Sequence, residues 1–428
     1  MPHQSPISPG RSWYEDSVGE RPAYPALDGS TACDVAVVGG GYTGLSAAYH
    51  LAKAGLDVVL IEQHRVGDGA SGRNGGQLGT GQRAWAEELE AELGLERAKA
   101  LFALAEEAKA HLLDFAATAG IDIDYRPGQI SAAHKPRHVD AYRAHAGIMA
   151  ERFGYPHLAF LDRAEISAAI GSGRYFGGLR DSGTGHIHPL KLLIGTARAA
   201  ASAGARIHEG TAATAIARQA GKVVVTTPRG QIAADRALVA VNAYGRDLEP
   251  ATAAHVMPIG SFIGATPPLP ADTPVLPGGE AVDDSRFVVR YFRKSADNRL
   301  LFGGREVYST GDPAGIMDQI RRQIAEVYPA LARTPLTHAW GGYVGITMPR
   351  KPFVREVMPG VISAAGWSGH GVMLSNFTGK LYAETVTGNR DRLRLLQDLK
   401  VPPFPGGRWL RAPILFLALN WFALRDRI

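Results

Sequence analysis

The chain has 428 residues, of which 45% are hydrophobic and 20% charged, proportions typical of a folded chain with a sizeable core. Its formal net charge of +5 is spread along the chain without a long basic run, which argues against nucleic-acid binding. The single cysteine, Cys33, excludes an intramolecular disulfide and a multi-cysteine metal or iron–sulfur site. We therefore expect a cytoplasmic protein without a resident metal.

The first 30 residues are rich in proline and lack a basic region followed by an apolar stretch, so they predict an N-terminal arm rather than a signal peptide. The next segment, CDVAVVGGGYTGLSAAYHLAKAGLDVVLIE, predicts a βαβ unit. Its strands are expected at 34–38 and 58–61, with a helix at 42–54 between them.

Three glycines at the first strand-to-helix turn carry the chemistry of this unit. Gly39, Gly41 and Gly44 form the pattern G-x-G-x-x-G, which allows a tight turn, close approach of a pyrophosphate, and close packing of helix on strand. The phosphates would lie at the helix N-terminus, beside Tyr42 and Thr43, where free N–H groups and the helix dipole favour anions. The unit therefore predicts a dinucleotide site.

Glu62 ends the second strand, where an acidic side chain accepts the ribose hydroxyls of an adenosine. An acid at this place disfavours a 2′-phosphate and therefore NADP, so FAD and NAD remain as the favoured dinucleotides.

The stretch GASGRNGGQLGTG, residues 69–81, is dense in glycine, which is typical either of a flexible linker or of a backbone that passes very close to a ligand. The remaining pattern alternates between helical and strand segments. We expect helices at 84–115 and 313–331, strand material at 120–134, a helix followed by a strand at 188–216, a hairpin at 223–244, and antiparallel strands at 258–305.

Four motifs, DVAVVGGGYTGLSAAYHLAKAG, GASGRNGGQ, GHIHPLKLL and GWSGHGVMLSNFTGK, together resemble the D-amino-acid-oxidase-like (DAO) family of FAD-dependent oxidoreductases, and particularly its gamma-glutamylputrescine oxidoreductase branch. The resemblance implies an α/β fold in which a Rossmann-type FAD-binding domain is interleaved with a substrate domain built on a mainly antiparallel sheet with helices. The expected segments are an arm at 1–30, FAD-binding pieces at 31–90, 183–248 and 338–395, substrate-domain pieces at 91–182 and 249–337, and a C-terminal helical tail at 396–428.

The resemblance also implies how two of these motifs contact FAD. The loop at 69–76 would run past the pyrophosphate and the flavin ring, because glycines leave room for a planar ring. The expected cofactor contacts in this loop are Ala70, Ser71, Arg73, Asn74, Gly75 and Gly76. Arg73 could instead pair with a surface carboxylate. Ala213, in EGTAATA, matches the segment whose backbone contacts adenine.

The second motif, residues 364–375, predicts a strand, a glycine turn and a helix that begins near Val372. Gly369, His370 and Gly371 would lie at the pyrimidine end of the flavin, where helix N–H groups stabilise negative charge. His370 is the best candidate for a catalytic side chain, and a structural role for it is equally open. His186 and His188 are expected to serve packing or turn hydrogen bonds.

Two features bear on the substrate. The segment 290–294 gathers basic and aromatic residues, of which Tyr291 and Arg293 could hold an acyl or carboxylate group, although a surface strand explains them equally well. The segment TMPRKPFV departs from the family pattern by lacking an acid, and its Arg350 and Lys351 favour a carboxylate-bearing substrate over a diamine. Both could also face solvent.

The implied activity is oxidation of an amine or amino acid, with hydride transfer from the α-carbon to flavin, hydrolysis of the imine, and reoxidation of the flavin by O2 to give H2O2. A dehydrogenase that uses a quinone or another acceptor, and a non-enzymatic flavin-binding module, stay open as alternatives. FAD is expected to be noncovalent because Cys33 precedes the glycine turn. The apolar segment near the C-terminus would pack on the body or, alternatively, contact a membrane.

Overall fold

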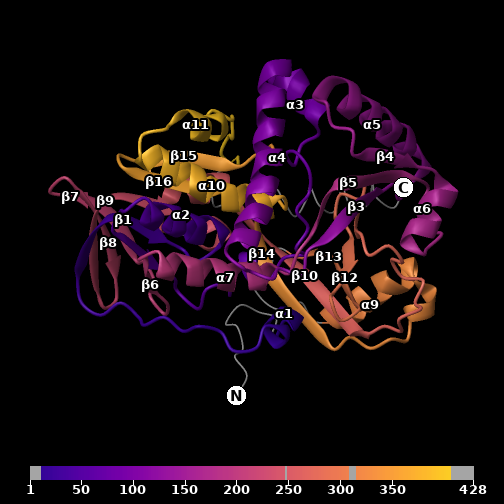
Figure 1. Ribbon diagram of the computed structural model, residues 1–428, viewed down its shortest axis with the longest axis horizontal. Helices are drawn as coiled ribbons and strands as arrows, with labels where there is room; N and C mark the ends of the chain where they lie inside the picture. Colours follow the sequence, from indigo (N-terminus) through magenta and orange to yellow (C-terminus); the bar gives the residue numbers. More distant parts are fainter. Residues whose placement is uncertain (1–10, 246–247, 308–314, 406–428) are drawn as a thin grey trace.

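Two sheets organise the chain, and each lies in its own lobe (Figure 1). The computed structural model describes residues 11–245, 248–307 and 315–405, with the side chains of 305–307 left out. The predicted C-terminal tail falls mostly outside these ranges, so its helix and its membrane contact stay predictions. Among the described residues, no helix is both long and apolar enough to cross a bilayer.

The first sheet has a parallel core in the order β16-β9-β1-β2-β6, to which β15 and the β7–β8 hairpin add antiparallel strands. Its strands are β1 (Thr31–Val38), β2 (Val58–Ile61), β6 (Arg206–His208), β7 (Ala215–Gln219), β8 (Lys222–Thr227), β9 (Gly230–Val239), β15 (Phe353–Met358) and β16 (Val361–Ala365). The central strand β1 and its neighbour β2 are largely buried and rich in valine, as is typical of parallel strands.

Helices α2 (Tyr42–Lys53), α7 (Pro189–Ser202) and α10 (Gly371–Val386) cover one face of this sheet (Figure 1). Their buried side chains form the largest apolar cluster, in which Leu45, Leu51 and Phe377 are fully buried. The long helix α4 (Leu95–Thr118) packs on the same cluster and stands between the two lobes.

The second sheet has the order β14-β10-β13-β12-β11-β3-β5-β4 and is antiparallel except where β11 pairs with β3. Its strands are β3 (Arg126–Ala132), β4 (Leu158–Leu161), β5 (Gly178–His186), β10 (Met257–Pro268), β11 (Ala281–Asp284), β12 (Tyr291–Lys294), β13 (Arg299–Val307) and β14 (His338–Ile346). The helices of this lobe are α5 (Val139–Phe153), α6 (Arg163–Ile170) and α9 (Ile316–Val327).

The predicted fold class, a Rossmann-type domain interleaved with a mainly antiparallel sheet, is confirmed. The boundary predicted at residue 338 precedes β14, whose partner β10 belongs to the second sheet, and the boundary predicted at residue 183 falls within β5. The helix predicted at 84–115 is two helices, α3 (Ala86–Leu93) and α4, which are separated at Gly94. Gly94 has a φ of +83°, a conformation that favours glycine and ends a helix.

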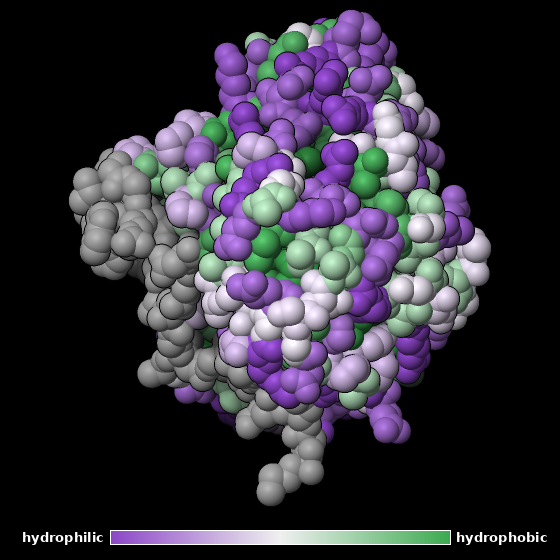
Figure 2. Space-filling model, turned by 90° about the vertical axis from the view of Figure 1, so that its left-hand side faces the viewer, coloured by the Kyte–Doolittle hydropathy of each residue, from purple (hydrophilic) through white to green (hydrophobic). Residues whose placement is uncertain are grey.

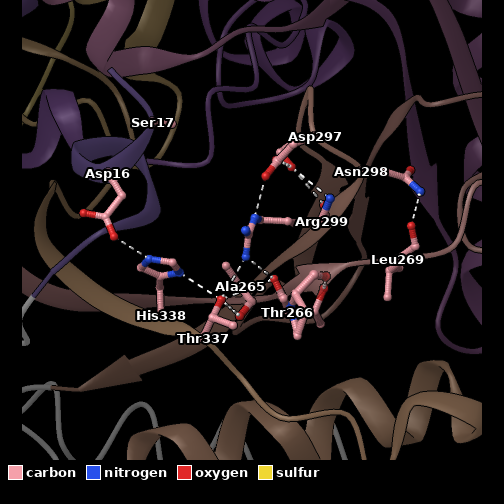
Figure 3. Close-up of polar contacts among 12 residues, drawn as sticks. Asp16, Ser17, Ala265, Thr266, Leu269, Asp297, Asn298, Arg299, Thr337 and His338 are labelled. Carbon is pink, nitrogen blue, oxygen red and sulfur yellow. Dashed lines mark hydrogen bonds and ion pairs between the residues drawn. The ribbon is translucent and has the colours of Figure 1, made fainter. Parts of the chain in front are cut away.

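The N-terminal arm connects the two lobes. Along the first sheet, the backbone N–H of Tyr24 donates to Glu209, at 3.2 Å. Helix α1 (Trp13–Ser17) then reaches the second sheet, where the carboxylate of Asp16 lies 2.9 Å from Nε2 of His338 on β14 (Figure 3). The opposite ring nitrogen of His338 lies 2.8 Å from the hydroxyl of Thr337, as Figure 3 also shows. The arm therefore has specific contacts in both lobes.

The remaining short helices are α8 (Pro250–His255) and α11 (Asp391–Gln397). In the part of the chain that the structure describes, four 3₁₀ turns lie at Ala70–Gly72, Pro136–His138, Asn242–Tyr244 and Pro329–Leu331. Figure 2 views the first-sheet end of the molecule, where hydrophilic and hydrophobic residues are intermixed over the described part of the surface.

Candidate cofactor and active site

The turn between β1 and α2 brings backbone amides to the end of the sheet without side chains in the way. Gly39 has a φ of +110°, which only glycine adopts readily, and a Cβ there would lie 2.7 Å from the carbonyl oxygen of Ala240. A Cβ on Gly44 would lie 1.9 Å from the carbonyl oxygen of Gly39. The helix therefore starts in close contact with the turn, and its first residues, Tyr42 and Thr43, line the cavity described below.

Glu62 lies directly after β2 and closes one side of this turn. Its carboxylate accepts N–H groups from Gly40, at 2.7 Å, and from His64, at 3.0 Å. Burial raises the pKa of Glu62, and the two hydrogen bonds and nearby acids modify it less. The carboxylate is thus fixed in orientation at the place predicted for a ribose contact.

The glycine-rich loop at 69–81 is ordered by its own polar side chains, so it is not a flexible linker. The hydroxyl of Ser71 accepts the N–H of Tyr42 at the start of α2, at 3.2 Å. The Asn74 amide donates to the carbonyls of Ala70, at 3.1 Å, and Ser71, at 2.7 Å, and its oxygen accepts the N–H of Gly76, at 2.8 Å. The side chain of Asn74 therefore shapes the loop from within.

Arg73 is buried, whereas the alternative interpretation placed its side chain at the surface. Its Nε donates to the carbonyl of Gly341 on β14, and the indole N–H of Trp340 donates to the carbonyl of Arg73, at 3.1 Å. These contacts attach the loop of the first lobe to the edge strand of the second sheet.

Two adjoining cavities meet at this loop. The first, of about 500 Å³, follows the β1–α2 turn and Glu62, and the second, of about 550 Å³, lies between the loop and the second sheet. Both are lined by Ala70, Asn74, Val344, Gly369 and Val372, so they share a wall at which a ligand could pass from one to the other.

The predicted cofactor residues distribute over these cavities, with one exception. The first cavity is lined by Gly39, Gly41, Tyr42, Thr43, Glu62, Ala70, Ser71, Asn74, Ala213, Gly369, Gly371 and Val372. The second is lined by Arg73, Gly75, Gly76 and His370, besides the shared residues. Gly44 lines neither cavity and serves the packing of α2 instead.

This geometry fits FAD. A Cβ on Gly41 would lie 2.8 Å from the Ser71 hydroxyl, inside the channel that a pyrophosphate needs. Glu62 offers carboxylate oxygens to a ribose, and Ala213 lies beyond it in the loop between β6 and β7. Gly369 and Val372, at the start of α10, line both cavities. A flavin ring that reaches from one cavity into the other would lie beside these residues.

His370 lies at the start of α10 and faces the glycine loop. Its Nε2 donates to the carbonyl of Gly81, at 3.1 Å, and its ring occupies the space beside Gly79, where a Cβ would lie 2.3 Å from the ring. Burial lowers the pKa of His370 to about 4, and the positive charges of Arg83 and, to a lesser extent, Lys109 contribute to this shift. The imidazole is therefore neutral at physiological pH and is a weak proton acceptor.

Of the three predicted substrate residues, Tyr291 and Arg350 line the second cavity and Arg293 does not. Arg293 is buried beneath the loop, where it donates to the carbonyls of Gly75, at 2.5 Å, and Ile187, at 3.0 Å. The guanidinium of Arg293 thus binds the backbone of the loop and lies outside the cavity wall, so its predicted substrate contact stays a prediction.

The basic pair at 350–351 also divides between two roles. Arg350 lines the second cavity, and its guanidinium carbon lies 5.1 Å from the ring centre of Phe287. The amino group of Lys351 instead pairs with Glu92 of α3, away from both cavities.

His186 and His188 serve packing and turn hydrogen bonds, as predicted. His186 bonds to the carbonyl of Gly279, at 3.0 Å, and His188 accepts the N–H of Lys191 as the N-cap of α7, at 3.2 Å. Within the described part of the chain, no group of three or more His, Cys, Asp or Glu residues is placed to hold a metal ion.

Most of the polar wall of the second cavity lies outside the residues predicted from the sequence. This wall includes Arg83, Gln129, Tyr142, Asp181, Asp283, Asp284 and Arg286. Burial raises the pKa of Asp283, and Asp284 forms an ion pair with Arg286. The two adjacent acids in the segment AVDDSRF were the one sequence feature that could have indicated this wall. They match no known motif spacing.

A dinucleotide cavity that opens into a second, polar cavity defines a nucleotide-dependent redox enzyme with a small-molecule substrate. The sequence model of the family described as "FAD dependent oxidoreductase" (DAO) matches residues 34–385. The chain belongs to this family, and its cofactor is FAD.

The curated relatives support the same assignment. The chain is 60% identical to "Probable oxidoreductase OrdL" of Rhizobium meliloti, over the full length of both. It is 37% identical to "Gamma-glutamylputrescine oxidoreductase" of Escherichia coli, over 97% of this chain and 98% of the relative. The solved structure of glycine oxidase from Geobacillus kaustophilus is 26% identical with a TM-score of 0.71, over 83% of this chain and 95% of that one. The chain is thus related to amine and amino-acid oxidases.

Proposed function

We propose that this protein oxidises an amine or amino acid at the carbon that bears the nitrogen, and that O2 is the final electron acceptor. The observation that carries the proposal is the shared wall of the two cavities at Asn74, Gly369 and Val372. When bound, FAD supplies the hydride acceptor. The residues of the chain then have to hold the cofactor, orient the substrate and manage its protons.

We propose that the β1–α2 turn, Glu62 and the loop at 69–76 hold the cofactor. The N–H groups at the start of α2 suit a pyrophosphate, and the Glu62 carboxylate suits ribose hydroxyls. Binding is noncovalent, a proposal supported by the position of Cys33, which lines neither cavity and whose pKa burial raises to about 11.

For the substrate, we propose an amine that also carries a carboxylate or another anionic group. The support is Arg350, a cation in the wall of the second cavity that suits a carboxylate. Gamma-glutamylputrescine, the compound in the name of a relative, is one such molecule and belongs in any screen.

Neutral His370 does not act as the main proton acceptor in this proposal. Its Nε2–H is already donated to Gly81, and a pKa of about 4 leaves it with little affinity for a proton at neutral pH. We propose that it supports the loop at the pyrimidine end of the ring.

An anaerobic screen of amines and amino acids tests the proposal. The expected result is loss of the visible absorbance of bound flavin with at least one carboxylate-bearing amine, followed by H2O2 formation when air is admitted. Bleaching with dye reduction but no peroxide would instead favour a dehydrogenase. Failure of every amine to bleach the flavin would contradict the proposal and favour a binding module.

A further inference from the structure

A continuous chain of hydrogen bonds leads from the second cavity into the protein. It begins at Asp181 of β5, which lines the cavity and is 7% exposed. Its carboxylate accepts the hydroxyl of the buried Tyr155, at 2.7 Å, and the N–H of Gly183, at 2.9 Å. The hydroxyl of Tyr155 lies 3.2 Å from the hydroxyl of Thr80 in the glycine-rich loop, and Thr80 also lines the cavity.

The chain continues through a buried lysine to the surface. The amino group of Lys109, on α4, donates to the Thr80 hydroxyl, at 3.1 Å, and pairs with Glu106, at 2.8 Å. The side chain of Lys109 is 6% exposed, whereas that of Glu106 is 24% exposed. Every link between the cavity wall and this partly exposed carboxylate is therefore within hydrogen-bonding distance.

We propose that Asp181, Tyr155, Thr80, Lys109 and Glu106 form a proton path between the substrate cavity and solvent. This inference rests on the proposed function, because an amine arrives mainly as an ammonium ion and must lose one proton before its carbon can give up a hydride. Asp181 accepts that proton as the ammonium N–H bond breaks and its own O–H bond forms. The same proton equivalent then leaves through the chain.

The chemistry of the links suits transfer in either direction. A hydroxyl both donates and accepts a hydrogen bond and rotates freely, so Tyr155 and Thr80 can each receive one proton and release another without a net change. Lys109 accepts a proton from Thr80 only after it has given one to Glu106, which exchanges with water. Burial raises the pKa of Glu106, so its carboxyl takes up a proton more readily than a surface glutamate.

A purely structural role explains this chain poorly. Burying a charged amino group is costly, and apolar residues would fill the same space between α4 and the loop at lower cost. Other titratable groups nearby are His157, His370 and Tyr125. The ring centre of His157 lies 5.0 Å from that of Tyr155, His370 bonds to Gly81, and the Tyr125 hydroxyl donates to the carbonyl of Thr184, at 3.4 Å. None of these contacts continues a bonded path from Asp181 to solvent.

The first test uses the unaltered holoenzyme. The rate of anaerobic flavin bleaching by a substrate amine is measured in mixtures of H2O and D2O. If several exchangeable protons move in the rate-limiting step, a plot of the bleaching rate against the D2O fraction is expected to be curved. A straight line would overturn the proposal, because it indicates that a single exchangeable proton limits the step.

Two variants interrupt the chain with little change in shape: Thr80→Val and Tyr155→Phe. Each is expected to bleach at least tenfold more slowly, and imidazole in the buffer is expected to restore part of the rate by carrying the proton instead. Tyr125→Phe makes the same change at an exposed tyrosine of the same lobe and is expected to match the wild type. A slow variant that imidazole does not restore would overturn the path in favour of a structural role.

A further measurement separates this inference from the proposed function. tert-Butylamine carries no hydrogen on its α-carbon and cannot be oxidised, but it can bind and release a proton. An indicator dye is expected to register that release at least tenfold more slowly in Thr80→Val than in the wild type. If no amine bleaches the wild type, the proposed function fails; equal release rates would overturn the path.

Discussion

The hydroxyl of Tyr14 donates a 2.8 Å hydrogen bond to the backbone carbonyl of Asn74 and joins the N-terminal arm to the glycine-rich loop. Tyr14 is fully buried, and the same hydroxyl accepts a bond from Arg293, at 3.0 Å. Because Arg293 also donates to the carbonyl of Gly75, both side chains bind the backbone of this loop. The arm therefore contacts the loop that lines both cavities.

Tyr14→Phe should weaken FAD binding. The substitution leaves the Asn74 carbonyl and one Arg293 donor without their buried partner, at a cost of about 1–3 kcal/mol. If the cofactor-bound form of the loop is destabilised by this free energy, the Kd for FAD rises by roughly tenfold or more. Fluorescence titration of the apoprotein with FAD measures the change.

Tyr49→Phe is the matched control for this experiment. The hydroxyl of Tyr49 lies on the outer side of α2, where its contact is with Lys53, at 3.4 Å. FAD affinity should stay at the wild-type value. An unchanged Kd in Tyr14→Phe would show that the arm does not support the loop.

Two glycines of the β1–α2 turn should behave differently when replaced by alanine. In Gly41→Ala the new Cβ meets only the movable Ser71 side chain, so the fold should persist while the pyrophosphate loses its space. In Gly44→Ala the Cβ would meet the backbone of Gly39, so the fold itself should be destabilised. Thermal unfolding of the apoproteins and the flavin content after purification distinguish the two outcomes.

Gly147→Ala, on α5, is the control, because a Cβ there meets nothing within 4 Å and alanine is favoured in a helix. Normal flavin content in Gly41→Ala would contradict the proposed position of the pyrophosphate.

The local parts of the site could be predicted from the sequence because their signals are short-range. The turn glycines, Glu62 and the loop at 69–76 lie within one βαβ unit and its continuation, where spacing along the chain determines spacing in the fold. The start of α10 was predicted near Val372 and lies at Gly371.

The remainder depends on contacts between distant segments, which periodicity does not report. Arg293 lies in a basic and aromatic segment that suits a cavity wall. On strand β12, however, its side chain bonds to the carbonyl of Gly75. Tyr14 lies in a segment with no secondary-structure signal beyond its prolines. Asp181, Tyr155 and Lys109 come from β5, the loop before β4, and α4, and only the folded chain brings them together.

Arg350→Met should raise the KM for carboxylate-bearing amines and leave kcat with neutral amines nearly unchanged. The reason is that Arg350 lines the second cavity, where its charge can pair with a substrate carboxylate, and loss of such a pair is worth about 1.5–3 kcal/mol or tenfold and more in KM. Lys351→Met is the control because Lys351 pairs with Glu92 outside the cavities. Steady-state kinetics with matched amines, with and without a carboxylate, measures the difference. Equal effects of the two variants on KM would contradict the proposed role of Arg350.

His50 and His111 make stability depend on pH. Their Nε2 atoms lie 3.2 Å apart between α2 and α4, and burial, followed by the proximity of His111, lowers the pKa of His50 to about 3. The pKa of an unfolded histidine is about 6.5. Between these values the unfolded chain binds the proton and the folded one does not, so the stability is fully present above pH 6.5 and is lost as the pH falls toward 3.

From pH 7.5 to 5.5, this linkage predicts that His50 removes about 1.4 kcal/mol from the free energy of unfolding. His50→Gln cannot take up a proton, so its free energy of unfolding should fall by that much less over the same interval. Urea denaturation at the two pH values measures the difference. Equal pH dependence in the variant and the wild type would show that His50 is protonated as readily in the folded state as in the unfolded chain.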